Sequence, residues 1–278
     1  KPSFGRVSRR GVFPLSWTMD HCGPLAACVE DAATVMQVIA GHDPADPGSL
    51  DRPVPDFGRK LEEGVRGLRI GVPWHFFADD PALTPQARDG IDRTVALLSD
   101  SGATIHSVTL PNLAELLACS RLIMAAESFT IHRDQLARNL PGYGAGATRR
   151  FVLGAGISAA DYLDAQRLRG TLATAMDERI SQFDALLTAI SLGPPPSFAS
   201  QSGSTAWPLQ ASPFNVTGHP AISVPIGLDR DGLPLAVQVV GRRFDEPGIL
   251  RVARSIEQLT GWKALQSSQH VHAAVANT

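Results

Sequence analysis

Cysteine, lysine and uninterrupted apolar runs are scarce in this chain of 278 residues. The three cysteines, Cys22, Cys28 and Cys119, are too few and too irregularly spaced for a disulfide framework or a zinc site. Such usage is typical of a reducing compartment, so we expect a cytoplasmic protein. Arg121 interrupts the best candidate for a membrane span, which is shorter than the roughly 18 residues required. We therefore expect no membrane partner.

The small number of lysines limits the chemistry that the chain can perform. Its lysines are Lys1, Lys60 and Lys263, each in a context typical of a loop or an exposed position. A lysine that acts as a general base must be buried, because burial lowers its pKa toward neutrality. The sequence also lacks the G-x-S-x-G pentapeptide of many serine hydrolases. We therefore expect no catalytic residues, and no complete pair of nucleophile and base, within the chain.

Charge and histidine spacing exclude further classes. The formal net charge is only −2, and the arginine pairs are scattered, so nothing favours nucleic acid as a partner. The eight histidines show no metal-binding spacing, and most are predicted to lie in loops or on the surface. We expect neither a metal nor a cofactor. The hydrophobic fraction of 44% is that of a soluble globular protein.

One glycine-rich segment has the spacing of a dinucleotide-binding loop. Residues 154–159 fit G-x-G-x-x-A, but only residues 151–153 precede them as a strand candidate, and the following helix is too long. We interpret the segment as a loop that ends in a helix cap. Ser158 is the predicted N-cap, and Asp161 occupies the acidic position of a capping box.

Apolar spacing and turn residues predict strands that alternate with helices, which is typical of an α/β layered domain. The predicted helices span residues 26–40, 84–98, 113–137, 158–180 and 246–260, and the strands 68–72, 103–108, 185–190, 221–224 and 235–240. Thr84 and Pro85 are the predicted N-cap and first residue of a helix. Pro225 fits a strand end, and a polar loop is expected up to about Gly218. We expect residues 1–266 to form one domain and residues 267–278 a disordered tail.

Six segments in consecutive order resemble the amidase-signature family and together span nearly the whole chain. They are KPSFGRVS at 1–8, PLSWTMDHCGPL at 14–25, residues 29–33 with 41–47, residues 158–169, SPFNVTGHPAISVP at 212–225, and GLPLAVQVVG at 232–241. The chain departs from the family at Thr188-Ala189-Ile190, where T-P-T is common.

The resemblance implies an α/β/α sandwich around a mixed β-sheet, incomplete at the N-terminus, and hydrolysis of a carboxylic amide. The family uses a serine nucleophile, a second serine on a cis peptide bond and a buried lysine, all of which precede the position that matches Lys1. We therefore interpret the chain as the C-terminal part of an amide hydrolase whose complete form acts on a small-molecule amide. The alternative is a non-catalytic amidase-like subunit, such as an amidotransferase component. A homodimer is one option for the oligomeric state.

Four residues are predicted to support the site rather than to react. The resemblance implies that the stretch matching Ser16–Gly23, which includes Trp17, lies close to the catalytic serines. Asp20 is predicted to orient this stretch, and a turn or cap role for Asp20 is an equal alternative. Phe214 and Asn215 match a motif that returns to the substrate side. The alternative is that these two residues serve packing and turn formation only, and we favour this alternative slightly for Phe214.

Overall fold

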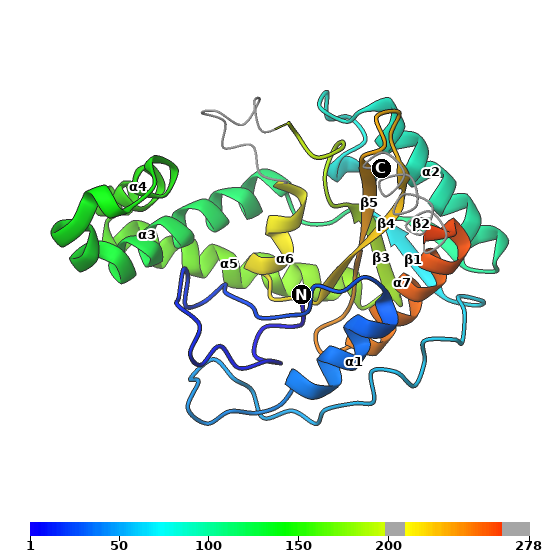
Figure 1. Ribbon diagram of the computed structural model, residues 1–278, viewed down its shortest axis with the longest axis horizontal. Coiled ribbons are helices and arrows are strands. Elements are labelled where there is room, and N and C mark those ends of the chain that lie inside the picture. The colour runs from blue at the N-terminus through cyan, green and yellow to red at the C-terminus, as the bar shows by residue number, and fades with distance from the viewer. Residues whose placement is uncertain (198–208, 263–278) are drawn as a thin grey trace, which may run out of the picture.

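A computed structural model of the chain describes residues 1–197 and 209–262 (Figure 1). The strands are β1 (Arg69–Val72), β2 (Thr104–Ser107), β3 (Ala185–Ala189), β4 (Ala221–Leu228) and β5 (Pro234–Val240). The helices are α1 (Val29–Ile39), α2 (Pro85–Asp100), α3 (Leu113–Asn139), α4 (Ala145–Val152), α5 (Ala159–Ile180), α6 (Ser212–Val216) and α7 (Glu246–Thr260). The predicted tail lies outside the described residues. Within them, no helix is both long and apolar enough to cross a bilayer.

The strands form one mixed sheet in the order β2-β1-β3-β5-β4. β1 pairs in parallel with β2 and β3, whereas β5 pairs antiparallel with β3 and β4. The β1-α2-β2 connection is the predicted β-α-β unit, because parallel neighbours need a crossover helix between them. Thr84 caps α2 by accepting a hydrogen bond from the Ala87 N–H, and Pro85 is the first helical residue, as expected.

Helices cover both faces of the sheet, which confirms the α/β/α architecture (Figure 1). α2 and α7 pack against each other and against β4 and β5 on one side. The long helices α3 and α5 lie on the other side with α6 and extend well beyond the strands. Buried aliphatic and aromatic side chains fill the space between the layers, and β3 is buried along its whole length. Ser158 and Asp161 form the predicted capping box at the start of α5.

Three local predictions were wrong. The polar loop expected before Gly218 contains α6, with Pro213 in its first turn, where the missing N–H costs nothing. β4 does not end at Pro225 but continues to Leu228 through an irregularity between Pro225 and Gly227. A proline is tolerated there because β4 is an outer strand of the sheet. Residues 145–152, for which the apolar pattern predicted no helix, form α4.

Among the described residues, the outer edge of β4 pairs with another backbone segment at its first residue, Ala221. Lys1 and Ala221 exchange both backbone hydrogen bonds, with N···O distances of 2.9 Å in each direction, which is an antiparallel pairing. The backbone groups of Ala221 therefore face away from β5. Because this direction alternates along a strand, Ser223 and Pro225 face the same edge, and Pro225 loses no ladder bond there.

This outer edge predicts self-association of the 278-residue chain, since an open strand edge is a template for pairing. Ser223→Pro removes an outward N–H and should shift the chain toward the monomer in sedimentation velocity. Val224→Pro is the matched control, because its N–H faces β5 and its loss should lower stability by about 1–3 kcal/mol through the carbonyl left unpaired on β5. A wild-type chain that is a monodisperse monomer with a sharp thermal transition would contradict this prediction.

Most of the eight histidines were expected in loops or on the surface, and two of them are buried: His132 in a helix and His219 in a loop. His132 lies on α3 and stacks on the Phe151 ring, with centroids 4.3 Å apart. His219 is completely buried, with its Nδ1 2.9 Å from the Thr217 hydroxyl and its Nε2 2.9 Å from the Asp177 carboxylate. Burial, and then the nearby cations Arg243 and Lys1, lower the pKa of His219 to about 3. The folded state therefore contains neutral His219 over the physiological pH range.

The lowered pKa of His219 predicts a loss of stability in mild acid. Between about pH 6.5 and 3 the unfolded chain binds a proton at this residue and the folded chain does not, so the free energy of unfolding falls as pH falls, by up to about 1.4 kcal/mol per pH unit. Chemical denaturation at about pH 7.5 and 5.0 should show that His219→Gln loses about 2 kcal/mol less than wild type over this interval. The same substitution at exposed His75 should leave the wild-type dependence unchanged. Parallel pH curves for wild type and His219→Gln would exclude the buried neutral histidine as the cause.

Candidate functional site

Asp20 folds the predicted site loop onto itself. Its Oδ2 accepts hydrogen bonds from the backbone N–H groups of Leu15 and Ser16, at 2.8 and 2.9 Å. The N–H of Asp20 in turn donates to the Ser16 carbonyl oxygen at 2.9 Å. The carboxylate thus closes a turn and also orients the loop. The same hydrogen bonds therefore serve both roles predicted for Asp20, the turn role and the orienting role. A further role for Asp20 in supporting catalysis stays a prediction.

Glu127 anchors the same loop to the helices. This α3 residue is 3% exposed, and its carboxylate accepts four hydrogen bonds from hydroxyl and backbone N–H groups. Oε2 binds the Ser16 hydroxyl at 2.5 Å and the Thr18 N–H at 3.1 Å. Oε1 binds the Thr18 hydroxyl at 2.8 Å and the Tyr162 hydroxyl, from α5, at 2.7 Å. A buried carboxylate is stable when its oxygens are satisfied in this way.

Arg169 connects this loop to α6, which contains the other two predicted residues. Its Nη2 donates to the Thr18 carbonyl oxygen at 2.7 Å, and its Nε donates to the Val216 carbonyl oxygen at 2.6 Å. α6 packs beside α3, as Figure 1 shows. Phe214 on this helix is completely buried in the hydrophobic core, in agreement with a packing role, and Asn215 is partly exposed. The two predicted segments therefore meet through a residue that was not among the predicted site residues.

Trp17 lies at the exposed tip of the loop. Its side chain is 49% exposed, and its carbonyl oxygen accepts a hydrogen bond from the Arg9 guanidinium. Arg9 is itself held by both carboxylate oxygens of Asp46, at 3.1 and 2.8 Å. The indole is therefore available at the surface, whereas the backbone below it is fixed.

Lys1 lies in a loop, as predicted, but its ammonium group is enclosed by other parts of the chain. Its Nζ donates to the carbonyl oxygens of His219, at 2.5 Å, and Pro2, at 3.3 Å, and lies 3.2 Å from His21 Nε2. Burial lowers the pKa of this ammonium to about 7, and the carboxylate of Glu246 opposes the shift. The sequence could not reveal this burial, because the residue that supplies the shortest contact is 218 positions away.

His21 completes the environment of Lys1. Its Nδ1 lies 2.6 Å from the Met19 carbonyl oxygen, so Nδ1 carries the proton and Nε2 accepts from the Lys1 ammonium. Burial, and then the positive charge of Lys1, lower the pKa of His21 to about 3. Since Lys1 uses its donors on carbonyl oxygens and this imidazole, the group holds three segments together rather than serving as a free base.

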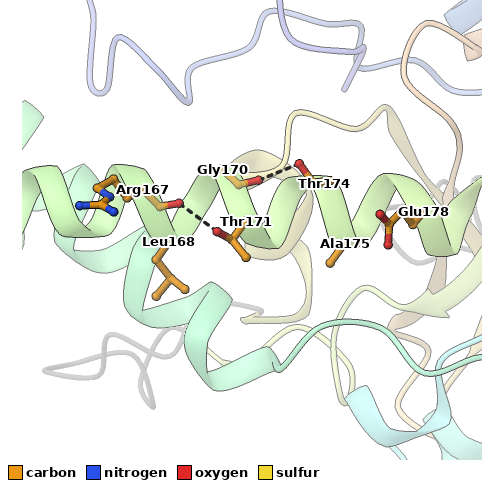
Figure 2. A pocket seen from close by; sticks show the side chains of 7 residues that line it. All are labelled: Arg167, Leu168, Gly170, Thr171, Thr174, Ala175 and Glu178. Carbon is orange, nitrogen blue, oxygen red and sulfur yellow. Dashed lines mark hydrogen bonds between the residues drawn. The ribbon is translucent and has the colours of Figure 1, made fainter.

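The depressions in the surface do not coincide with this network. One groove of about 370 Å³ runs between residues 24–29, the outer edge of β4 and α7. A wider depression lies along one side of α5, between Arg167 and Glu178 (Figure 2). All of its lining residues come from that helix, and the hydroxyls of Thr171 and Thr174 donate to the backbone of their own helix at Arg167 and Gly170. The groove beside β4 is lined by Cys28 and Ser223 as well as by Glu246 and Glu257, but these two carboxylates accept from the Ser3 and Val29 N–H groups.

Within the part of the chain that the structure describes, two buried hydroxyls contact a base: that of Ser16 contacts Glu127, and that of Thr217 contacts His219. All four residues are almost fully buried, at 0–3% exposure, so a substrate cannot reach either hydroxyl. No cluster of three or more potential metal ligands occurs among residues 1–197 and 209–262. The arrangement can position a loop, but its accessible groups do not form a nucleophilic centre.

The sequence contained partial signals for the residues that were missed. Tyr162 and Arg169 lie within one of the six segments that resemble the amidase-signature family. Glu127 follows the apolar run Leu122–Ala126 in a helix, and a carboxylate in that context needs a specific partner. Only the fold identifies the partners, which lie 109 and 111 positions away at Thr18 and Ser16.

Comparison with known proteins places the chain in one family. The sequence model of the amidase family matches residues 1–250. An amidase from Pseudomonas putida is 37% identical over 94% of this chain and 58% of its own length. A glutamyl-tRNA(Gln) amidotransferase subunit from Acidobacterium capsulatum is 34% identical over 93% of this chain and 60% of its own length. The chain thus spans about three-fifths of the curated relatives that it matches.

Solved structures share the fold over the same portion. A vestigial protein complex related to the origins of an s-triazine catabolic enzyme superposes with a TM-score of 0.86 at 30% identity, over 94% of this chain and 58% of that one. A glutamyl-tRNA(Gln) amidotransferase subunit from Thermotoga maritima gives a TM-score of 0.79 at 31% identity, over 93% of this chain and 57% of that one. The order of the motifs, the α/β/α architecture and these matches agree, and the chain belongs to the amidase family.

Proposed function

We propose that this chain is the C-terminal part of an amide hydrolase and that the complete protein converts a small carboxylic amide to an acid and ammonia or an amine. The observation that carries the proposal is the match to the P. putida amidase, which extends over 94% of this chain but only 58% of that enzyme. About two-fifths of that enzyme lies outside the match, and we place there the serines and the lysine that the family resemblance implies.

In the proposed reaction, the upstream lysine accepts a proton through the bridging serine while the nucleophilic serine attacks the amide carbon. Backbone N–H groups stabilise the oxyanion, the protonated amine leaves, and water then releases the acid from the acyl-enzyme. The residues of this chain contribute geometry. Asp20 and Glu127 hold the loop at residues 16–20, which we place beside the serines, and Arg169 fixes that loop relative to α6.

A second function is supported by other relatives. Glutamyl-tRNA(Gln) amidotransferase subunits from several bacteria match this chain at 34–36% identity. A role as an amidase-like component of a larger assembly would use the same fold with a partner protein. We favour the hydrolase on the match to the P. putida amidase, which is 37% identical to this chain.

Joining the chain at Lys1 to the part of the P. putida amidase that it does not match tests the proposal. The joined protein should hydrolyse simple aryl or aliphatic amides, and the 278-residue chain alone should not exceed background, because it lacks the nucleophile. A folded joined protein without amidase activity would contradict the hydrolase. Turnover by the chain alone, abolished by a substitution within it, would contradict the upstream location of the centre.

Asp20→Asn in the joined protein should lower kcat about 10- to 100-fold and leave KM nearly unchanged, by analogy with residues that orient metal ligands. The reason is that the charge-assisted bonds to Leu15 and Ser16 hold the geometry of the transition state. Asp229→Asn is the matched control, since Asp229 accepts two backbone N–H groups, from Asp231 and Leu233, in the remote β4–β5 turn. An unchanged kcat for Asp20→Asn would leave Asp20 with a turn role only.

A further inference from the structure

Thr18 is bound by two charged side chains through all of its polar groups. Its N–H and hydroxyl donate to opposite oxygens of the Glu127 carboxylate, and its carbonyl oxygen accepts from Arg169. Glu127 lies on α3 and Arg169 on α5, so the residue is held between two helices. A loop residue in this position cannot change its backbone orientation without breaking several charge-assisted bonds.

The contacts of Glu127 exceed what the packing of the two helices needs. α3 and α5 already contact each other closely, for example through Cys119, whose Sγ lies 3.7 Å from the Ala165 carbonyl oxygen. Three of the four donors to Glu127 come from Ser16 and Thr18 in the loop, and only one comes from α5. A buried carboxylate is costly unless it is fully bonded, and here most of its bonds fix the loop.

Asp20 and Glu127 act on the same turn from opposite sides. Asp20 binds the N–H groups of Leu15 and Ser16 from within the loop, whereas Glu127 binds the Ser16 hydroxyl and Thr18 from the helix. The first interaction sets the shape of the turn, and the second sets its position relative to the scaffold. Loss of the Asp20 contacts would leave the loop in place but with an altered shape. Loss of the Glu127 contacts would leave the turn intact but displaced from the helices.

We propose that Glu127 is a positioning residue for the amide-hydrolysing centre, acting through Thr18, an inference that rests on the proposed function. Arg169 completes the unit, because it fixes the Thr18 carbonyl oxygen relative to Val216 on α6. Displacement of the loop by a fraction of an ångström would misalign the reacting groups, which lowers kcat more than substrate affinity.

Two substitutions that each remove one hydroxyl from the same carboxylate oxygen test this assignment. Thr18→Val removes the loop donor to Oε1, and Tyr162→Phe removes the helix donor to Oε1. In the joined protein, Thr18→Val should lower kcat about 10-fold or more, by analogy with residues that orient ligands, with little change in KM. Tyr162→Phe should keep kcat within about 2-fold of wild type, because every loop contact remains. Equal effects of the two variants, or none, would overturn the positioning role.

Glu127→Ala and Glu127→Gln extend the test to the carboxylate itself. Gln keeps an oxygen for Ser16 and the Thr18 N–H, and its amide can donate to the two hydroxyls, so it should restore most of the kcat that Ala loses. In the 278-residue chain, Glu127→Ala should speed hydrogen exchange of the Thr18 amide about 10-fold or more, measured by NMR, while amides in β3 stay protected. Unchanged exchange at Thr18 would overturn the inference even if the joined wild type is active. An inactive joined wild type with faster exchange in Glu127→Ala would overturn the proposed function but support the anchoring of the loop.

Discussion

Buried carboxylates that accept hydrogen bonds from a loop-rich segment are the interactions on which this structure depends most. Residues 1–28 contain no helix, and their pairing with the rest of the chain includes an isolated bridge between Val7 and Ala40. Their backbone groups must find partners elsewhere, because an unpaired buried polar group is costly. Glu127 on α3 and Glu246 on α7 supply those acceptors from opposite sides of the fold.

Glu246 shows the same principle as Glu127 at the other end of the segment. It is the first residue of α7, and its Oε1 accepts from the Ser3 N–H at 2.9 Å, while its Oε2 lies 3.4 Å from Arg6 Nε. Arg6 and Glu246 are both nearly fully buried, and Arg6 also donates to the Pro53 carbonyl oxygen. Removing one member of such a pair typically costs about 3–5 kcal/mol, because the other charge is left uncompensated. The scaffold is held by apolar packing, and the segment above it is positioned by charge.

The regular elements could be predicted from the sequence because their signals are local. Thr84, Ser158 and Glu246 begin helices where capping residues and apolar periodicity place them, and the β-α-β unit follows from the spacing of its parts. The failures share a different cause. α6 is a helix of five residues, which is too short to show an apolar period. Pro225 is tolerated inside β4 because its nitrogen, which carries no hydrogen, faces away from β5.

The sequence predicted only part of the site, because the contacts that form it join residues that are distant in the sequence. The motif resemblance pointed to the loop around Asp20 and to the segment that contains Phe214, but not to the contacts that bring them together. Glu127, Arg169 and Lys1 obtain their roles from partners that are distant in the sequence, by 109, 151 and 218 positions, which no local pattern encodes. Burial of Lys1 in particular depends on the turn at residues 217–220, since the His219 carbonyl oxygen is its shortest contact.

The central claim is that charged residues of this chain hold the loop at residues 16–20 against the reacting centre of an amide hydrolase. A crystal structure of the joined protein, with its reactive serine labelled by a phosphonofluoridate, tests this claim most directly. We expect the labelled serine to contact residues 16–23, and Thr18 to remain bound by Glu127 and Arg169. A labelled serine that lies away from this loop, on another face of the domain, would contradict the account.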